Sequence, residues 1–363
     1  MVNLALGLTA RGHRVEFFLY YPQFDHFSGS LVQTGIPIHA CEKRSRFSTK
    51  PLVELYRLIR REEFDVVLSF LSTPSFYSEI CGCGCGSKNF RLIVSERSVY
   101  TSDSLPPSHW LLQQAHRLAD YITVNSHHQR ERMERLFPWM RRKITTIYNG
   151  VDLGTFKPLD PPAYRATTPV NLLALGTVVS KKNAIGLIRG LHHYHDKFKA
   201  SCKVCWAGKV SHNDESRREF YAAQKLIFEL GLQDHWIWLG ERKDVPELLR
   251  SCDALIHPSF YEGLPNAICE ALACGRPVLA GNVCDHPRLV QDGLTGFLFD
   301  PSNPTAIAAA ILRFAELNKE DRNDMGRQAR LLAERELSLD VYVSRYEKLF
   351  QTILNINRLN AKE

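Results

Sequence analysis

Short apolar runs alternate with longer amphipathic segments along most of the chain. The short runs predict strands near residues 15–20, 65–71, 91–96, 121–126 and 144–149, and a second series near 170–176, 203–208, 235–240, 253–259 and 277–281. Between these runs apolar residues recur at helical spacing, as at Ala184, Leu187, Ile188 and Leu191. This alternation predicts α/β domains in which helices cover both faces of parallel sheets.

The chain divides into two such domains. The segment 152–168 contains Pro158, Pro161 and Pro162 and is typical of a linker. We therefore predict a first domain over 1–155 and a second over 165–338. A final helix over 339–358 carries an apolar stripe that includes Tyr342 and Tyr346, and we expect it to cross back to the first domain.

The opening of the chain departs from the usual doubly wound pattern. Such a domain normally begins with a strand and a Gly-rich turn that presents backbone N–H groups to a phosphate. This chain begins with a helical pattern over 2–10, followed by Gly12 and a strand. We therefore expect the first domain to lack the opening strand and its turn.

Composition is that of a globular protein: of 363 residues, 44% are hydrophobic and 23% are charged. These values exclude a disordered chain and a collagen-like fibre. No apolar run approaches the roughly 18 residues that span a bilayer. The first residues show no basic stretch and no cleavage site of a secretory signal, so we expect a cytoplasmic location.

The ten cysteines are not expected to form disulfides in that compartment. Cys202 and Cys205 lie in a predicted strand and should point to opposite faces, which disfavours a metal or redox pair. Cys81, Cys83 and Cys85 alternate with glycines. They could bind a metal, but no fourth ligand is evident nearby, and a loop of small residues is favoured.

Positive charge is concentrated in the first part of the chain. The net charge is +7, and residues 1–150 carry 19 Lys and Arg against 13 Asp and Glu. The basic segment 130–143 also contains Phe137 and Trp139, a mixture that suits an anionic membrane surface or a lipid-linked phosphate. A solvated helix face is an equal alternative. Nucleic acid is disfavoured, because no nucleic-acid motif accompanies the charge.

The densest chemical signal lies at 258–277. A strand ends near His257, a helix follows from about Pro265, and Gly275 ends that helix. The helix N-terminus therefore lies at the carboxyl end of a strand, where doubly wound sheets bind ligands and where free N–H groups favour a phosphate. Glu262 precedes the helix and Glu270 lies inside it, so the two carboxylates suit different parts of one elongated ligand.

The pair Glu262-x7-Glu270 within PSFYEGLPNAICEALACGRPV resembles the signature of family-4 glycosyltransferases with the GT-B fold. Other segments agree with the same family: IYNGVD at 147–152, the run from Gly176 to Lys182 and Asn183, GERKDVPELLRSCD at 240–253, and DGLTGFLFDPSNP at 292–304. The resemblance covers nearly the whole chain. It implies two Rossmann-like domains that face a cleft, with the C-terminal helix crossing back to the first.

The resemblance also implies roles for individual residues. Glu270 would bind the ribose hydroxyls of a nucleotide, Glu262 would contact the donor sugar, and Lys182 would neutralise the leaving diphosphate. The backbone of Gly263, Leu264, Pro265 and Asn266 would hold the sugar and diphosphate beside the Gly176 turn. Arg242 would line the base pocket, although a surface arginine is an equal alternative. Asn183 would either contact the ligand or cap the helix that begins near Ala184.

Two positions depart from the family pattern. Thr177 stands where the family usually has an arginine, and Lys181 would partly replace that cation. Many members place a histidine after the fourth strand of the first domain, whereas this chain has Ser95-Glu96-Arg97. Glu96 and Arg97 are therefore candidates for contact with the acceptor, and an internal pair between Arg97 and an acid is the alternative.

The resemblance thus implies a retaining glycosyltransferase that moves a sugar from a nucleotide sugar, most simply a UDP-sugar, to a glycan or lipid-linked acceptor in cell-surface polysaccharide synthesis. Neither a metal nor another cofactor is expected. Peripheral contact with the inner face of an anionic membrane fits the basic first half. The alternatives are a non-catalytic nucleotide-sugar-binding subunit or truncated pseudoenzyme of the same fold, a sugar-nucleotide epimerase, and a basic nucleic-acid binder.

Overall fold

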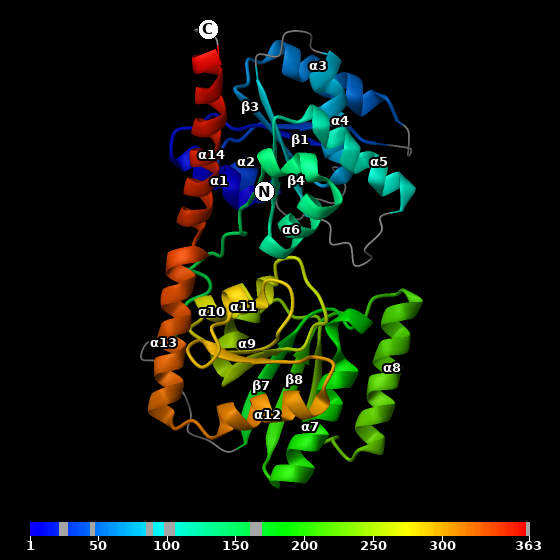
Figure 1. Cartoon of the computed structure of the whole chain (residues 1–363), viewed down its shortest axis with the longest axis vertical. Helices are drawn as coiled ribbons and strands as arrows, with labels where there is room; N and C mark the ends of the chain where they lie inside the picture. Colours follow the sequence, from blue (N-terminus) through cyan, green and yellow to red (C-terminus); the bar gives the residue numbers. More distant parts are fainter. Residues whose placement is uncertain (22–27, 44–47, 85–89, 98–105, 160–168, 361–363) are drawn as a thin grey trace. The chain divides into compact units, whose positions relative to one another are not determined.

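The computed structural model describes residues 1–21, 28–43, 48–84, 90–97, 106–159 and 169–360 (Figure 1). Its contacts divide the chain into two compact units. The first unit is Met1–Gly150 together with Leu339–Glu363, and the second is Val151–Ser338. The C-terminal segment therefore packs with the beginning of the chain.

The strands of the first unit are all parallel to their neighbours. They are β1 Phe17–Leu19, β2 Ile38–Ala40, β3 Val66–Phe70, β4 Arg91–Glu96, β5 Tyr121–Val124 and β6 Ile144–Thr146. β1 pairs with β2 in one small sheet, and β3, β4, β5 and β6 form a second sheet in chain order. The apolar runs predicted all of these except β2, where Pro37 and His39 interrupt the apolar residues so that no run stands out.

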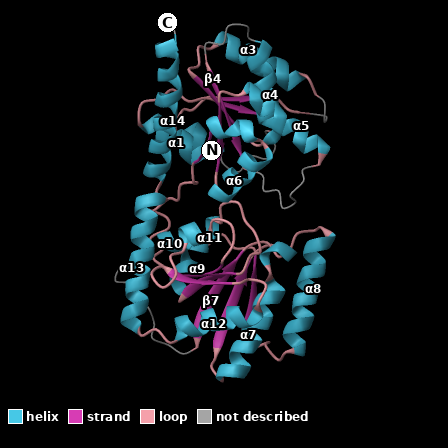
Figure 2. Ribbon diagram, viewed as in Figure 1, coloured by secondary structure: helices cyan, strands magenta, loops and turns pink. Residues whose placement is uncertain are grey.

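Helices pack on both faces of the four-stranded sheet (Figure 2). The helices of this unit are α1 Val2–Ala10, α2 Ser28–Gln33, α3 Lys50–Arg61, α4 Ser72–Gly84, α5 Pro107–Ala115, α6 His127–Leu136 and α14 Leu339–Asn360, with short 3-10 helices η1 His116–Leu118 and η2 Pro138–Arg142. Side chains of β4 alternate between the faces. Leu92 and Val94 join the core under α3, α4 and α6, whereas Ile93 packs toward α1 and α14.

Helix α14 is bound to the first unit through α1, beside which it lies in Figure 1. Its predicted apolar stripe is buried, including Tyr342 and Tyr346. The helices approach closely, because a Cβ on Gly7 would overlap the Val343 side chain. Arg11 at the end of α1 forms ion pairs with Asp340 and Glu347 of α14.

The second unit is built on one six-stranded parallel sheet in the order β12-β11-β10-β7-β8-β9. These strands are β7 Val170–Leu175, β8 Cys202–Ala207, β9 Trp236–Gly240, β10 Ala254–His257, β11 Val278–Gly281 and β12 Gly296–Phe299. The apolar runs predicted each of them except β12, which lies inside the 292–304 motif. The order reverses at β7, so the neighbouring β7 and β10 form the switch point at which doubly wound sheets bind ligands.

Two groups of helices surround this sheet. They are η3 Ser180–Lys182, α7 Ala184–Phe198, α8 Asp214–Glu229, α9 Val245–Ser251, α10 Asn266–Ala273, α11 His286–Leu289, α12 Pro304–Ala315 and α13 Lys319–Glu336. Helices α7, α8 and α12 share one core with the strands, in which Trp206 and Ile188 are buried. Helix α10 instead packs against β10, β11 and α13. Successive side chains on a strand therefore point alternately toward the α7, α8 and α12 side and toward the α10 side of the sheet.

The cysteines correct one expectation. Cys81 and Cys83 lie in the last turn of α4 and not in a loop, and Cys85 lies outside the described residues. Cys81 is buried and its thiol donates to the Leu52 carbonyl at 3.4 Å, whereas Cys83 is exposed. Tertiary packing of Cys81 outweighs the low helix propensity of the glycines. Cys202 is buried and Cys205 is half-buried on β8, as the strand alternation predicts.

Candidate functional site

A pocket of about 280 Å³ lies at the carboxyl ends of β7, β8 and β9 in the second unit. It is lined by Leu175, Gly176, Thr177, Ala207, Gly208, Lys209, Glu241, Arg242, Val245 and Glu270. Three of the residues singled out from the sequence, Gly176, Arg242 and Glu270, thus lie around one cavity. Its place at the strand ends is where doubly wound sheets bind ligands.

The floor of this pocket is backbone, because two turns approach each other too closely for side chains. Gly176 has φ +148°, and a Cβ on Gly208 would overlap the Gly176 carbonyl oxygen. The Gly208 N–H donates to the Gly240 carbonyl at 2.8 Å, and the Trp206 indole donates to the Gly176 carbonyl at 2.8 Å. A ligand can therefore come close to peptide groups that the strand ends hold in place.

Glu270 presents an unpaired carboxylate to this pocket. It lies on α10, which is followed after Cys274 by Gly275 in a left-handed conformation with φ +65°. Within the described ranges, no hydrogen bond or ion pair to the Glu270 carboxylate is found, and burial raises its pKa to about 7. A half-buried carboxylate without donors costs stability, and two ligand hydroxyls would satisfy it.

Lys182 and Glu262 form an ion pair beside the pocket. Lys182 ends η3, Glu262 lies in the loop between β10 and α10, and Nζ is 2.5 Å from Oε1. The side chains are 17% and 10% exposed. Burial alone would raise the pKa of Glu262, but His257 and Lys182 hold that pKa far below its usual range. A Cβ on Gly176 would lie 3.0 Å from Lys182 Cε, so the lysine stem packs against the pocket's glycine turn.

Asn183 is a helix cap. Its backbone is left-handed with φ +58°, and its Oδ1 accepts the Gly186 N–H at 3.0 Å. Its Nδ2 donates to the carbonyls of Pro258 at 3.1 Å and Pro301 at 2.7 Å. These bonds use both donors of the amide, and the side chain is buried, so Asn183 joins the start of α7 to the loop after β10 and does not face a ligand.

The other predicted residues surround the same region. Gly263, Leu264 and Pro265 are buried, and α10 begins at the exposed Asn266. Arg242 lines the pocket, and it also forms a partly exposed ion pair with Asp244 at 2.5 Å. The residue thus has features of both alternatives, a pocket residue and a surface arginine. Thr177 lines the pocket where the family usually has an arginine, and Lys181 Nζ stands 5.7 Å from the centre of the Tyr261 ring.

Motif reasoning missed three buried polar residues next to the ion pair: His257, Ser259 and His286. His257 Nε2 is 3.1 Å from Ser259 Oγ and 3.5 Å from Glu262 Oε1. Its ring meets that of His286 edge to face, with centroids 5.3 Å apart. A polar residue that ends the otherwise apolar strand ALIH is a signal that points to His257. No spacing in the sequence identifies His286.

Glu96 is enclosed in the first unit. It ends β4 and is 2% exposed, and its carboxylate accepts from Gln113 Nε2 at 2.9 Å and from the Arg97 N–H at 2.9 Å. His116 lies between this carboxylate, at 3.8 Å, and that of Glu79, at 2.6 Å. Burial would lower the pKa of His116, but the two glutamates raise it to about 9. Glu96 thus belongs to a buried network that supports the end of β4.

The Arg97 guanidinium is turned away from Glu96. It donates to Ser95 Oγ at 2.8 Å and to Tyr346 Oη of α14 at 3.0 Å, and it also bonds Asn149. The group lies over the Phe70 ring at 5.2 Å. An internal side-chain pair between Arg97 and Glu96 is therefore not formed, and α14 takes part in holding this arginine at the strand ends.

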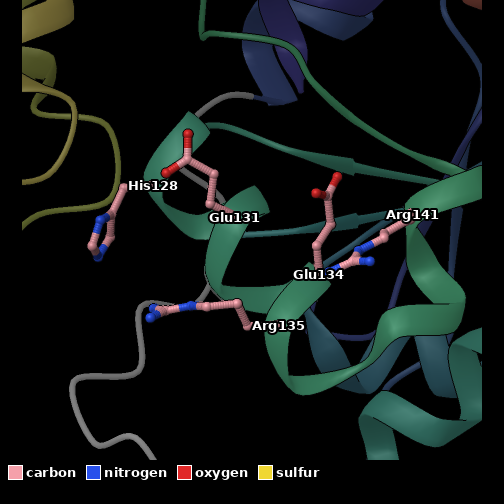
Figure 3. Close-up of a pocket in the computed structure, with 5 residues that line it drawn as sticks. All are labelled: His128, Glu131, Glu134, Arg135 and Arg141. Atoms are coloured by element: carbon pink, nitrogen blue, oxygen red, sulfur yellow. The ribbon is translucent and has the colours of Figure 1, made fainter.

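The basic segment 130–143 forms α6, η2 and a second pocket, of about 390 Å³ (Figure 3). His128, Glu131, Glu134 and Arg135 of α6 and Arg141 of η2 line it. Both charge signs meet there, and Arg130 also pairs with Glu134 at 2.7 Å. Charges of this pocket are therefore partly compensated. The Trp139 ring lies 5.2 Å from the cations of both Arg117 and Lys143, on the neighbouring surface.

Comparison with known proteins agrees with the geometry of both units. The model of Glycosyltransferase Family 4 matches residues 1–155, and that of Glycosyl transferases group 1 matches residues 160–332. Parallel sheets and these matches define a glycosyltransferase with the GT-B fold. The chain belongs to the family-4 glycosyltransferases.

Two curated relatives and two solved structures illustrate the similarity. D-inositol 3-phosphate glycosyltransferase of Mycobacterium sp. (strain JLS) is 31% identical over 50% of this chain and 42% of that protein, so this chain spans less than half of its length. UDP-Gal:alpha-D-GlcNAc-diphosphoundecaprenol alpha-1,3-galactosyltransferase of Escherichia coli is 24% identical over 74% of this chain and 70% of that protein.

A glycosyltransferase from Rickettsia africae has a TM-score of 0.82 at 18% identity and covers 97% of this chain and 93% of its own. Anabaena HepE, solved with UDP and glucose, has a TM-score of 0.74 at 18% identity and covers 96% of this chain and 95% of its own. At this level of identity the two structures show that the fold is shared.

Proposed function

We propose that this protein transfers a sugar from a UDP-sugar to a glycan or lipid-linked acceptor in cell-surface polysaccharide synthesis. The observation that carries the proposal is the unpaired Glu270 carboxylate at a pocket floored by backbone, beside the Lys182 amine. The UDP and glucose bound to HepE support the donor, and the name of the Escherichia coli galactosyltransferase supports a lipid-linked acceptor.

The donor would extend across the second unit. Its ribose hydroxyls would donate to Glu270, its diphosphate would meet Lys182 and the N-terminus of α10, and its sugar would lie near Glu262. In the reaction the bond between C1 and the phosphate oxygen breaks, and its electron pair leaves with UDP. The acceptor oxygen bonds C1, and its proton passes to the leaving phosphate on the same face, which retains the anomeric configuration.

Electrostatics would lower the barrier of this step. Negative charge grows on the leaving diphosphate, where the Lys182 ammonium and the helix N-terminus are already in place. Because these groups can carry that charge, we propose that transfer requires no metal ion. In the first unit we retain Arg97 as the candidate for contact with the acceptor, and Glu96 as its support.

Calorimetric titration with UDP tests the site. Glu270→Ala should weaken UDP binding at least about tenfold, since charge-assisted hydrogen bonds are lost. Glu229→Ala, which removes an exposed glutamate of α8, is the matched control and should bind UDP like the wild type. Unchanged affinity in Glu270→Ala would refute the site.

Release of UDP from a panel of UDP-sugars, with and without a polyprenyl-diphosphate glycan acceptor, tests the reaction. Turnover with one donor supports an enzyme. Tight UDP binding without turnover of any donor would favour the second candidate, a non-catalytic nucleotide-sugar-binding subunit. One observation favours that candidate: Thr177 lines the pocket in place of the family's arginine, so the diphosphate has one fewer cation.

We also propose that the first unit contacts the inner, anionic face of a membrane from the cytoplasm. In the described part of the chain, no helix has the length and apolar content to cross a bilayer. On the continuous helix α5–η1, Trp110 is 50% and Leu111 63% exposed, and the exposed Arg117 and Leu118 follow. Apolar side chains beside cations suit an interface with anionic lipid.

Sedimentation with phosphatidylglycerol vesicles tests this contact. The wild type should bind them and ignore phosphatidylcholine vesicles, and Trp110→Ser/Leu111→Ser should bind phosphatidylglycerol at least about fivefold more weakly while keeping UDP affinity. Equal binding of the wild type to both lipids, or no loss in the double variant, would exclude this surface.

A further inference from the structure

We propose that His257 is a positioning residue that holds the Glu262 carboxylate once the donor's diphosphate has engaged Lys182. This inference rests on the proposed function of the second unit and adds a residue to its site. His257 is the last residue of β10, and its Nε2 lies 3.5 Å from Glu262 Oε1 and 3.1 Å from Ser259 Oγ.

The location of His257 calls for a functional explanation. The preceding Ile256 packs in the core under α7, α8 and α12, so strand alternation directs His257 to the opposite face, which carries α10. The residue is only 1% exposed. A polar side chain buried at the end of an apolar strand is costly unless it is hydrogen-bonded. The groups that its Nε2 meets are Ser259 and the Glu262 carboxylate.

The ion pair of Lys182 shows when His257 would act. The Lys182 amine lies 2.5 Å from Glu262 Oε1, and its stem packs against the Gly176 turn of the pocket. A diphosphate there would compete with Glu262 for the amine. Among the described residues, Lys182 and His257 are the basic side chains with a nitrogen within 4 Å of this carboxylate. If Lys182 moves to the phosphate, His257 remains to hold Glu262.

The hydrogen-bond roles follow from the chemistry of each group. An ionised carboxylate only accepts, so the proton of His257 must be on Nε2 for this bond to form. His286 supports the ring from the side: its Nδ1 donates to the Gly281 carbonyl at 2.7 Å, and burial lowers its pKa to about 3. This second imidazole is therefore neutral and packs against the His257 ring, 5.3 Å between centroids, without adding charge near Lys182.

The inference predicts a separation between binding and turnover. Glu270 and Lys182 hold UDP, so loss of His257 should leave UDP affinity within about twofold. The orientation of Glu262 matters when the sugar reacts, so kcat should fall at least about tenfold while KM changes little.

Two amide substitutions of His257 distinguish a positioning role of its Nε2 from a role in packing alone. In His257→Gln the side-chain nitrogen reaches the former place of Nε2, whereas in His257→Asn the same group is one methylene shorter. Glutamine should restore kcat to within about threefold of the wild type, and asparagine should lose at least about tenfold. The matched control, His195→Gln, changes a histidine that bonds Cys202 at the amino end of β8, far from the pocket, and should leave kcat unchanged.

The measurements are UDP titration, thermal unfolding, and kcat and KM for hydrolysis of the UDP-sugar that turns over fastest among UDP-glucose, UDP-galactose and UDP-N-acetylglucosamine. Wild-type kcat in His257→Asn would overturn the inference. Equal losses of kcat and UDP affinity in both variants, in parallel with a lower Tm, would also overturn it, because they indicate packing alone. A wild type that neither binds UDP nor hydrolyses a donor would instead refute the proposed function.

Discussion

The pocket carboxylate of Glu270 should make UDP binding depend on pH and release a proton. Burial raises its pKa to about 7, and no donor among the described residues opposes the shift. Ribose hydroxyls donate to the ionised form, so binding must remove the proton that Glu270 holds below that pKa. At pH 7 about half of the molecules carry this proton, and binding should therefore release about 0.5 proton from Glu270.

The magnitude follows from the fraction ionised, which is about 0.9 at pH 8 and about 0.1 at pH 6. Ionisation of Glu270 should therefore make UDP affinity about tenfold lower at pH 6 than at pH 8. The β-phosphate of UDP titrates in the same range, with a pKa near 6, and needs a control. Glu270→Gln has nearly the same shape and no proton to lose, so the ratio of wild-type to variant affinity isolates Glu270.

Calorimetry in two buffers with different ionisation enthalpies measures both the UDP affinity and the number of protons released on binding. At pH 8 the wild type should bind UDP about 10 to 100 times more tightly than Glu270→Gln, and at pH 6 this advantage should shrink about tenfold. The wild type should release about 0.5 proton more than the variant at pH 7. A ratio independent of pH, together with equal proton release, would refute the assignment of Glu270 to the ribose.

The free energy of unfolding should fall as pH rises, whereas UDP affinity should increase. The folded pKa of Glu270 lies above its ordinary value of 4.5, so its protonated form is favoured by folding and stability falls as pH rises from about 4.5 to 7. A rise of the pKa from 4.5 to about 7 corresponds to about 3 kcal/mol. Glu270→Gln should thus be more stable than the wild type by about 3 kcal/mol at pH 8 and by about 1 kcal/mol at pH 5. Tryptophan fluorescence in guanidinium reports this, because Trp206, Trp236 and Trp238 lie in the second unit.

Other substitutions test separate parts of the second unit. Gly208→Ala should abolish UDP binding, because the new Cβ would overlap the Gly176 carbonyl; a variant with normal UDP affinity would show that the turns can separate. Lys182→Met should weaken UDP binding at least about tenfold and Lys182→Arg less, by calorimetry, and equal losses would argue against a simple charge role. Asn183→Ala removes a cap and two buried bonds and should cost about 2–4 kcal/mol in denaturant unfolding; a cost below about 1 kcal/mol would mean that water replaces the amide. Ile188→Ala should cost about 2–5 kcal/mol and leave UDP affinity unchanged at low temperature, and a lower affinity there would indicate that the core and the pocket are coupled.

Most of the elements that carry the site could be predicted from periodicity. Apolar runs of four or more residues became strands, and Gly275 ended α10 as its type suggests. Strand β2 could not be predicted, because Pro37 and His39 interrupt the apolar residues around it. The run around Cys81 was taken for a loop because glycine disfavours helices, yet Cys81 is buried and the helix continues to Gly84. Local propensity was outweighed there by packing that no local pattern contains.

For the candidate site too, the residues could be predicted from the sequence but their contacts could not. Glu262, Glu270, Lys182 and Gly176 could be named because the short segments that contain them resemble motifs of the family, and the resemblance implies their roles. Their geometry could not be foreseen: nothing in the chain order indicates that Lys182 pairs with Glu262, or that Glu96 is enclosed by α5.

By itself, then, the sequence determined the alternation of strands and helices, the two parallel-sheet units and the family, since these depend on periodicity and on residues close together in the chain. Only the tertiary structure decided that His257 lies beside Glu262, that Gly208 must be a glycine, and that the Glu270 carboxylate finds no donor in the described part of the chain. Those properties depend on the distance between atoms from different strands and on how much water reaches them. Both arise only when the sheet brings the strand ends together.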